Sequence, residues 1–200
     1  MSLLEIQKEL ERLPISINKY RPSSGDGRSQ AFGIVNRRCL PPDYSRQCWL
    51  RPYLYHLLLE YGRNHVPFAF TSVTVNQNYK ADPHRDRGNI GESYLVAFGD
   101  YINGELEIHE GPLKGLHDVR QPIIADFTKI LHSVKEFQGT RYSLVYYTCK
   151  KSEGLPEASV ELQEDKWVFL RGGIVCKNLP HPLAGRKKTN QMPQISEEPE

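Results

Sequence analysis

Two stretches of the chain place apolar residues at the period of an α-helix. Near the N-terminus, Ser2 and Glu5 form a capping box, and the helical pattern that follows ends before Pro14. Its apolar stripe consists of Leu3, Leu4, Ile6, Leu10 and Leu13. The second stretch runs from about residue 45 to residue 64, and Pro52 either lies in its first turn or kinks it. The pattern predicts two amphipathic helices that pack on a larger body.

From Phe68 onward, the spacing of apolar residues changes to the alternation of β-strands. Strands are predicted at residues 68–79, 93–99, 104–109, 119–126, 129–134 and 141–148, separated by Gly, Asn, Asp and Pro turns. Many short strands behind two helices favour an α+β, mainly β fold: a double-stranded β-helix (jelly roll) with flanking N-terminal helices.

The rest of the chain gives the domain boundaries. Residues 1–66 are predicted to form a helical and loop region that packs on a jelly-roll core at 67–180, and the two together make a single domain. Residues 21–30 have the composition of a polar loop, and a hairpin is predicted within residues 166–176. Residues 181–200 are rich in Pro, Lys, Gln and Glu, which predicts a disordered tail.

Composition narrows the class of protein. Hydrophobic residues make up 38% of the chain and charged residues 25%, as in soluble globular proteins, and no apolar run is long enough to span a bilayer. The four cysteines form no Cys-x-x-Cys pair, so we expect reduced thiols. The N-terminus has no basic region followed by an apolar stretch, so we expect an intracellular protein. We further expect it to be nuclear if eukaryotic, monomeric and without a membrane partner. The net charge of +2 identifies no partner. Residues 19–87 hold eleven Lys or Arg against five Asp or Glu, a surplus that could face phosphates or only solvent.

A candidate metal site comes from three residues. His84 and Asp86 are separated by one residue just after a predicted strand, and in extended chain such side chains point the same way. His132 lies in another predicted strand, where an imidazole without a partner would cost free energy. Two imidazoles and one carboxylate on one face of a metal leave three coordination positions open, as in iron(II) oxygenases. The His-x-Asp pair alone is a weak signal, because such pairs occur by chance in turns.

A candidate cosubstrate site follows downstream. Arg141 opens the strand predicted at 141–148, and Ser143 shares its face. A guanidinium inside a barrel offers a planar fork of donors, and a hydroxyl beside it adds another, which suits the distal carboxylate of 2-oxoglutarate. These residues predict an enzyme that uses Fe(II), O2 and 2-oxoglutarate, releases succinate and oxidises a nearby C–H bond. In the alternative interpretation, Arg141 pairs with a structural acid at the barrel rim.

The motifs also resemble a known family. The segments PHRDRGN (83–89), GEL (104–106), LHSV (131–134) and RYSLVYY (141–147) are similar to the TET/JBP branch of 2-oxoglutarate oxygenases, over roughly residues 70–149. That branch oxidises the methyl group of 5-methylcytosine or thymine in DNA. The resemblance implies a nucleic-acid partner, double-stranded DNA with methylated cytosine, and the base must leave the stack to reach a buried metal. Some algal members use ascorbate in place of 2-oxoglutarate.

The resemblance also assigns roles to residues. It implies metal ligands at His84, Asp86 and His132, and cosubstrate contacts at Arg141 and Ser143. It further implies that Asn89 hydrogen-bonds the flipped base and that Tyr147 stacks on it.

One position departs from the pattern. Cys149 stands where several TET proteins carry a base-contacting histidine, so thymine, a differently held cytosine or an RNA base stays possible. Arg87, with Arg85 and Lys80, could hold phosphates beside the extruded base.

Related oxygenases place cosubstrate-binding groups on the strand before the metal motif, which points to Asn76, Asn78 and Tyr79. Asn76 and Asn78 share a face with His84 only if that strand is unbroken, because a bulge reverses the alternation. Two other functions compete with a DNA base oxidase: an oxygenase acting on a protein side chain or a small metabolite, and a non-catalytic jelly roll that binds a metal for structure.

Overall fold

The computed structural model describes residues 2–15, 27–37 and 39–176. The predicted tail at 181–200 and residues 21–26 of the predicted loop lie outside the described residues. Within that part of the chain, no helix combines the length and the apolar character needed to cross a membrane.

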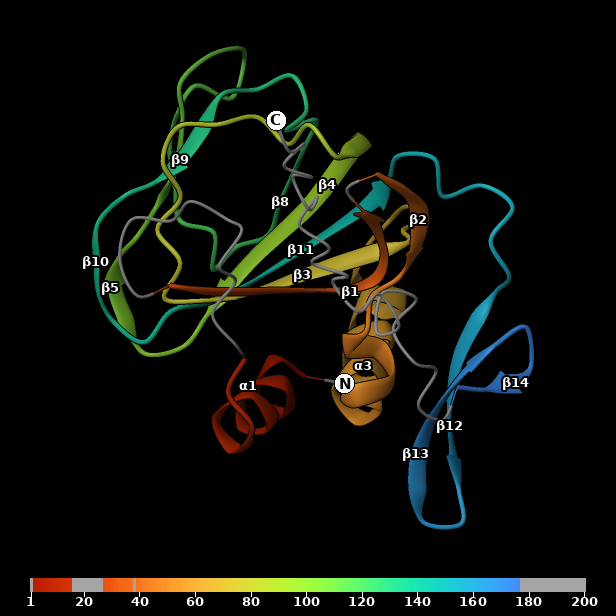
Figure 1. Cartoon of the computed structure of the whole chain (residues 1–200). Coiled ribbons are helices and arrows are strands. Elements are labelled where there is room, and N and C mark those ends of the chain that lie inside the picture. The colour runs from red at the N-terminus through yellow and green to blue at the C-terminus, as the bar shows by residue number, and fades with distance from the viewer. Residues whose placement is uncertain (1, 16–26, 38, 177–200) are drawn as a thin grey trace, which may run out of the picture.

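The centre of the fold is an antiparallel major sheet of six strands in the order β2-β1-β3-β11-β4-β8 (Figure 1). Their bounds are β1 Arg28–Arg37, β2 Leu40–Tyr44, β3 Ser72–Gln77, β4 Asn89–Phe98, β8 Ile123–Ala125 and β11 Tyr142–Cys149. The long pairings are those of β3, β11 and β4, with Ser143 opposite Asn76 on one side and Ala97 on the other.

A smaller sheet faces one side of the major sheet. It consists of β7 (Gly115–His117), β6 (Leu106–Ile108) and β9 (His132–Val134), and a backbone bridge between His84 and His132 extends it. A hydrophobic cluster joins the two sheets, with Leu95 and Ala97 of β4 packed among Leu106, Ile108 and Phe127. Two facing antiparallel sheets around a shared core confirm the predicted jelly roll.

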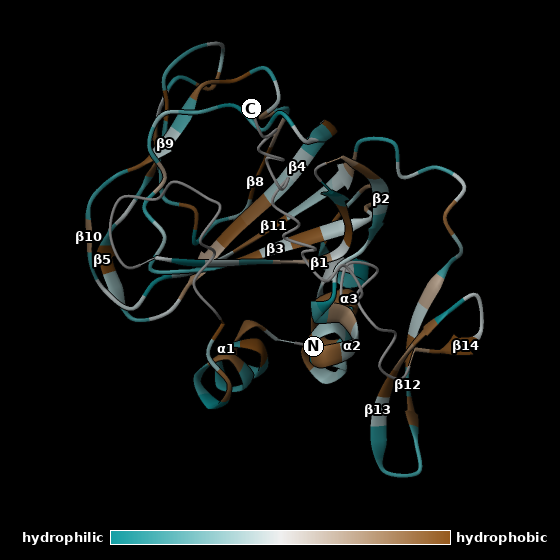
Figure 2. Ribbon diagram, in the orientation of Figure 1, coloured by the Kyte–Doolittle hydropathy of each residue, from teal (hydrophilic) through white to brown (hydrophobic). Residues whose placement is uncertain are grey.

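Helices cover the other side of the major sheet. They are α1 (Leu3–Arg12), α2 (Gln47–Leu50) and α3 (Pro52–His65), and α1 is hydrophobic toward the sheet and hydrophilic outward (Figure 2). The predicted capping box at Ser2 and Glu5 is present. Leu58 and Tyr146 are fully buried in this layer, and the Tyr146 hydroxyl donates to the Leu58 carbonyl oxygen at 2.8 Å. A fully buried aliphatic side chain such as that of Leu58 contributes roughly 1.5–3 kcal/mol to the free energy of unfolding.

The predicted second helix is divided in two. The backbone at Arg51 leaves the helical region, with φ −136° and ψ 57°, and Pro52 then starts α3 at its first position. Proline is favoured there, because the first helical N–H groups have no partner inside the helix.

All six predicted strand regions contain strands, most of them shorter than predicted. The loop predicted at 21–30 is wrong at residues 28–30, because they begin β1 and pair with β3, Arg28 opposite Gln77. The sequence pattern also missed β2, β5 (Tyr101–Asn103), β7, β10 (Phe137–Gly139) and β12 (Ala158–Gln163). The hairpin predicted within 166–176 is confirmed as β13 (Lys166–Arg171) and β14 (Ile174–Val175). Together with β12, these two strands form a separate sheet packed on α3.

Candidate metal centre and adjoining pocket

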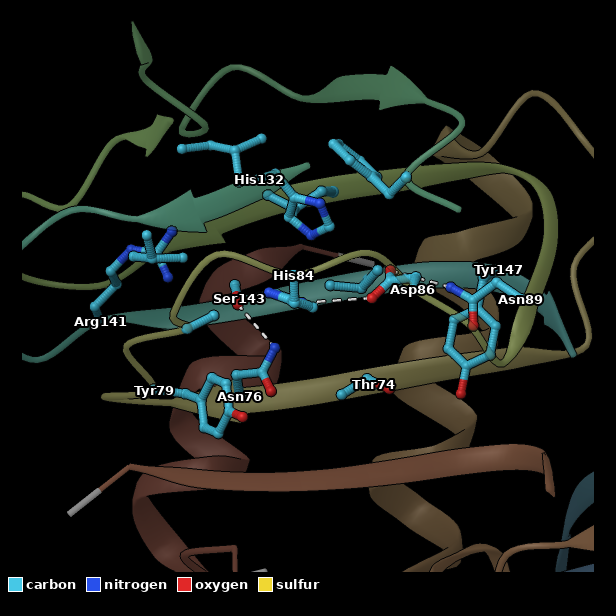
Figure 3. A pocket seen from close by; sticks show the side chains of 16 residues that line it. Thr74, Asn76, Tyr79, His84, Asp86, Asn89, His132, Arg141, Ser143 and Tyr147 are labelled. Atoms are coloured by element: carbon cyan, nitrogen blue, oxygen red, sulfur yellow. Dashed lines mark hydrogen bonds and ion pairs between the residues drawn. The ribbon is translucent and has the colours of Figure 1, made fainter. Parts of the chain in front are cut away.

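His84, Asp86 and His132 lie together between the two sheets. The backbone N–H of His84 donates to the His132 carbonyl oxygen at 2.9 Å, and the reverse bond is 3.0 Å, so the imidazoles lie side by side with ring centroids 4.3 Å apart. Asp86 is held by a bond from its N–H to the Phe127 carbonyl oxygen at 3.0 Å. One ligand atom from each of the three side chains lies within 4.8 Å of the others (Figure 3). Two imidazoles and one carboxylate are a suitable donor set for Fe(II).

Hydrogen bonds orient each ligand. The Nδ1–H of His84 donates to the Asp82 carbonyl oxygen at 2.7 Å, and that of His132 donates to the Ile130 carbonyl oxygen at 3.0 Å. A carbonyl only accepts, so in the neutral rings Nε2 keeps its lone pair for a metal. His84 Nε2 lies 3.5 Å from Asp86 Oδ1, while Asp86 Oδ2 accepts a hydrogen bond from Asn89 Nδ2 at 3.1 Å.

The three candidate metal ligands differ in how deeply they are buried. His132 is buried, and burial lowers the pKa of its imidazole, which favours the neutral form that binds metals. The side chains of His84 and Asp86 are 43% and 23% exposed. The cluster is therefore anchored in the core on the His132 side and open to the adjoining pocket on the other.

Arg141 closes one end of this pocket. The residue is only 2% exposed, and burial lowers the pKa of its guanidinium, although the neighbouring Tyr101 acts in the opposite direction. Its Nε has no hydrogen-bond partner in the part of the chain that the structure describes. Among residues 2–15, 27–37 and 39–176, no carboxylate forms an ion pair with it, so the structural-acid alternative finds no support there. Its backbone is fixed by Asn78, whose Oδ1 accepts from the Arg141 N–H at 2.8 Å. A buried cation without a counter-ion is ready to bind a carboxylate.

The floor of the pocket is polar along β3 and β11. Asn76 Nδ2 donates to Ser143 Oγ at 3.1 Å, while Asn76 Oδ1 and Thr74 Oγ1 are buried without a partner. Asn78 does not line this pocket, because its φ of +49° breaks the alternation at the end of β3. The prediction that depended on an unbroken strand therefore fails for Asn78, while Asn76 does line the pocket.

Of the four residues predicted to bind the substrate, two line the pocket and two do not. Asn89 and Tyr147 line the pocket at the end opposite Arg141 (Figure 3). Cys149 does not line it; its thiol is buried in a small cluster with Ile34 and Tyr147, where burial raises its pKa. Arg87 is an exposed residue outside the pocket.

The three residues predicted to hold phosphates differ in whether they form ion pairs within the protein. Arg85 bonds Glu110 at 2.5 Å, and Lys80 pairs with Glu136, so both are already engaged within the protein. Arg87 has no ion pair among the described residues.

Sequence reasoning missed three features of the site. Thr74 lies two residues before Asn76 on the same strand face, and strand alternation could have found it. Gly104 leaves room for the Arg141 side chain, since a Cβ there would lie 3.1 Å from Arg141 Cδ. The bond from Asn89 to Asp86 depends on the geometry of the intervening turn, and no pattern in the sequence signals it.

Comparison with known proteins supports the fold. No protein-family model matches the chain, and no curated protein matches it significantly. Among solved structures, NgTET1 in complex with 5mC DNA matches with a TM-score of 0.52 and 16% identity, over 77% of this chain and 71% of that one. A 2OG-Fe(II) oxygenase family oxidoreductase from Burkholderia pseudomallei matches with a TM-score of 0.50 and 17% identity, over 72% and 77%. The chain therefore has the fold found in these 2-oxoglutarate oxygenases.

Proposed function

We propose that the chain is an Fe(II)- and 2-oxoglutarate-dependent dioxygenase. The observation that carries the proposal is the placement of Arg141 in the same pocket as the His84, Asp86 and His132 cluster, buried and with no carboxylate ion pair among the described residues. A buried guanidinium without a counter-ion costs free energy, so a protein retains one where a carboxylate binds. This site favours 2-oxoglutarate over ascorbate, which has no carboxylate for the guanidinium to hold.

Each group has a role in this proposal. His84, Asp86 and His132 hold Fe(II) through two Nε2 atoms and Oδ1, and with O2 and 2-oxoglutarate bound the metal supplies the oxidising chemistry. Arg141 holds the distal carboxylate, and the Ser143 hydroxyl and the Asn76 amide lie along the floor between that end and the metal. On the buried side of the centre, the Phe127 ring packs on His132, with the two ring centroids 4.6 Å apart, and shields that imidazole from water.

We propose a methylated base of DNA, 5-methylcytosine first, as the substrate. The end of the pocket opposite Arg141 carries the aromatic ring of Tyr147, on which a flipped base could stack. The buried Thr74 hydroxyl, which has no partner among the described residues, could hydrogen-bond the polar edge of that base. Arg87 lies outside the pocket, is exposed and forms no ion pair with the residues that the structure describes, so it can contact a phosphate. The fold shared with NgTET1, whose structure holds 5mC DNA, supports this choice.

The test is a comparison of matched DNA duplexes. Purified protein with Fe(II), O2 and 2-oxoglutarate should release succinate faster with a methylated duplex than with an unmethylated one, and mass spectrometry of the nucleosides should find 5-hydroxymethylcytosine. Asp86→Ala should abolish both signals. Equal succinate release from both duplexes would end the nucleic-acid proposal and leave a protein or metabolite substrate. Tightly bound zinc with no oxygen consumption would show a non-catalytic metal-binding protein.

A further inference from the structure

We propose that Asn89 is a positioning residue of the metal site, which fixes the carboxylate of Asp86 in the orientation that binds the ion; this rests on the metal site of the proposed function. The residue is 7% exposed, and its Nδ2 donates to Asp86 Oδ2 at 3.1 Å. The same nitrogen lies 3.5 Å from Ser93 Oγ. The resemblance implies a base contact for Asn89, whereas its amide nitrogen is directed at the metal-binding carboxylate (Figure 3).

The three ligands differ in what orients them. Backbone carbonyl oxygens accept hydrogen bonds from the outer nitrogens of His84 and His132. The outer oxygen of Asp86 accepts from a side chain, that of Asn89. A carboxylate held by one oxygen cannot turn freely, so it loses less rotational freedom when the other oxygen binds a metal. This contact can be removed by substitution, and the two backbone contacts cannot.

The turn that carries Asn89 is fixed from several directions. The Asp86 N–H bonds to the Phe127 carbonyl oxygen, and the Asn89 N–H lies 3.5 Å from the Asp86 carbonyl oxygen. Next to it, the Gly88 carbonyl oxygen accepts hydrogen bonds from the Lys150 N–H at 3.0 Å and from Asn36 Nδ2 at 3.1 Å. Asn89 then starts β4 opposite Cys149. The amide therefore faces Asp86 before any metal or substrate arrives.

The experiment measures metal affinity rather than turnover. Chelator-treated protein is titrated with Co²⁺ and followed by the visible absorbance of the bound ion, in wild type, Asn89→Ala and Asn89→Asp. We expect Asn89→Ala to bind Co²⁺ roughly 10- to 100-fold more weakly. Asn89→Asp also loses the donor, because an ionised aspartate donates no hydrogen bond, but its negative charge attracts the cation, so its Co²⁺ affinity should fall less than that of Asn89→Ala.

Two controls separate this role from a folding defect. Asn64→Ala removes an equivalent amide, one that donates to the Glu60 carbonyl oxygen on α3, and should leave the Co²⁺ affinity unchanged. Circular dichroism and the unfolding midpoint of the metal-free variants report the fold. Should Asn89→Ala not fold, Asn89→Asp keeps the shape of the side chain and gives the comparison.

The outcomes distinguish this inference from the proposed function. Wild-type protein that binds no Co²⁺ would refute the metal site itself. Unchanged Co²⁺ affinity in both folded Asn89 variants would overturn the positioning role and leave the proposed function standing. An increase in KM for methylated DNA at unchanged metal affinity would overturn it too, since that result assigns Asn89 to the base alone.

Discussion

Replacing Arg141 with methionine should weaken 2-oxoglutarate binding strongly and should stabilise the protein when no ligand is added. The residue is 2% exposed, burial lowers its pKa, and Nε lacks a partner. The desolvation of this charge is therefore not offset by a counter-ion in the ligand-free state. An unbranched apolar side chain of similar length fills the same space without that cost.

The expected magnitudes follow from these contacts. Replacing buried ionic groups by apolar residues is often neutral or stabilises by about 1–4 kcal/mol. We expect roughly 1–2 kcal/mol, because the guanidinium carbon lies 5.5 Å and 5.8 Å from the centroids of the Tyr101 and Phe137 rings and loses that attraction. For a chain of this length, the unfolding midpoint should rise by roughly 2–8 °C. Losing two charge-assisted hydrogen bonds of about 1.5–3 kcal/mol each should weaken 2-oxoglutarate binding by roughly 10²- to 10⁴-fold.

The assay pairs thermal unfolding of metal-free protein with calorimetric titration of 2-oxoglutarate into Mn²⁺-loaded protein. Arg120→Met is the matched control: Arg120 lies 4.4 Å from the same Tyr101 ring, but its side chain is 45% exposed and pairs with Asp118. This control should keep its 2-oxoglutarate affinity and show no rise in midpoint. A loss of stability in Arg141→Met with affinity intact would identify Arg141 as a structural group and refute the carboxylate site.

Two further predictions follow from other parts of the structure. In Gly104→Ala, the new Cβ would lie 2.9 Å from Phe137 Cβ and 3.1 Å from Arg141 Cδ, so it would displace Arg141 and the Phe137 ring beside it. The dissociation constant of 2-oxoglutarate in the same titration should rise roughly 10- to 100-fold. Gly111→Ala, with a similar φ (+79° against +77°) and nothing within 4 Å, should leave the dissociation constant unchanged, and equal effects of the two substitutions would indicate backbone strain alone. Burial raises the pKa of the Cys48 thiol to about 12, whereas a cysteine in the unfolded chain has a pKa of about 8.5. Because the folded protein keeps this proton to a higher pH than the unfolded chain, the free energy of unfolding should decrease as the pH rises from about 8.5 to about 12. A thiol reagent at pH 8.5 should modify the exposed Cys39 while Cys48 reacts only on unfolding, and equally fast modification of both would contradict the burial.

The sequence predicted elements with a regular apolar pattern. α1 buries one stripe of its surface, and its apolar residues repeat at the helical period. β11 lies inside the major sheet and is buried on both faces, and its run of aromatic and branched residues is typical of such a strand. β1 shows neither pattern, because its residues are buried in an irregular order between β2, β3 and α2. Three-residue strands such as β5 and β10 are defined by pairing with a distant segment, Phe137 opposite Asn103, and one sequence does not contain that information.

The same reasoning separates the residues of the site. Arg141 directly precedes β11 and Ser143 lies two residues further on, so the alternation of side chains along an extended chain predicts that both face the same pocket. Asn78 could not be placed, because a single residue in the left-handed region ends the pattern. The direction of the Asn89 amide is set by a turn whose bonds come from Phe127, Lys150 and Asn36, all distant in sequence. The spacing of residues in the sequence therefore predicts which residues gather at a site, but it does not predict what each of them contacts.

Successive side chains of β3 point to opposite faces of the major sheet, so the strand contributes both to the apolar core and to the pocket. Val73 and Val75 point into the apolar layer under the helices, and they are at most 1% exposed. Thr74 and Asn76 point to the opposite face, where each leaves one buried oxygen without a partner. Each such atom costs about 1–3 kcal/mol, a cost that the helix layer must offset. A ligand whose polar atoms hydrogen-bond to these two oxygens would remove that cost, which would add to its binding free energy.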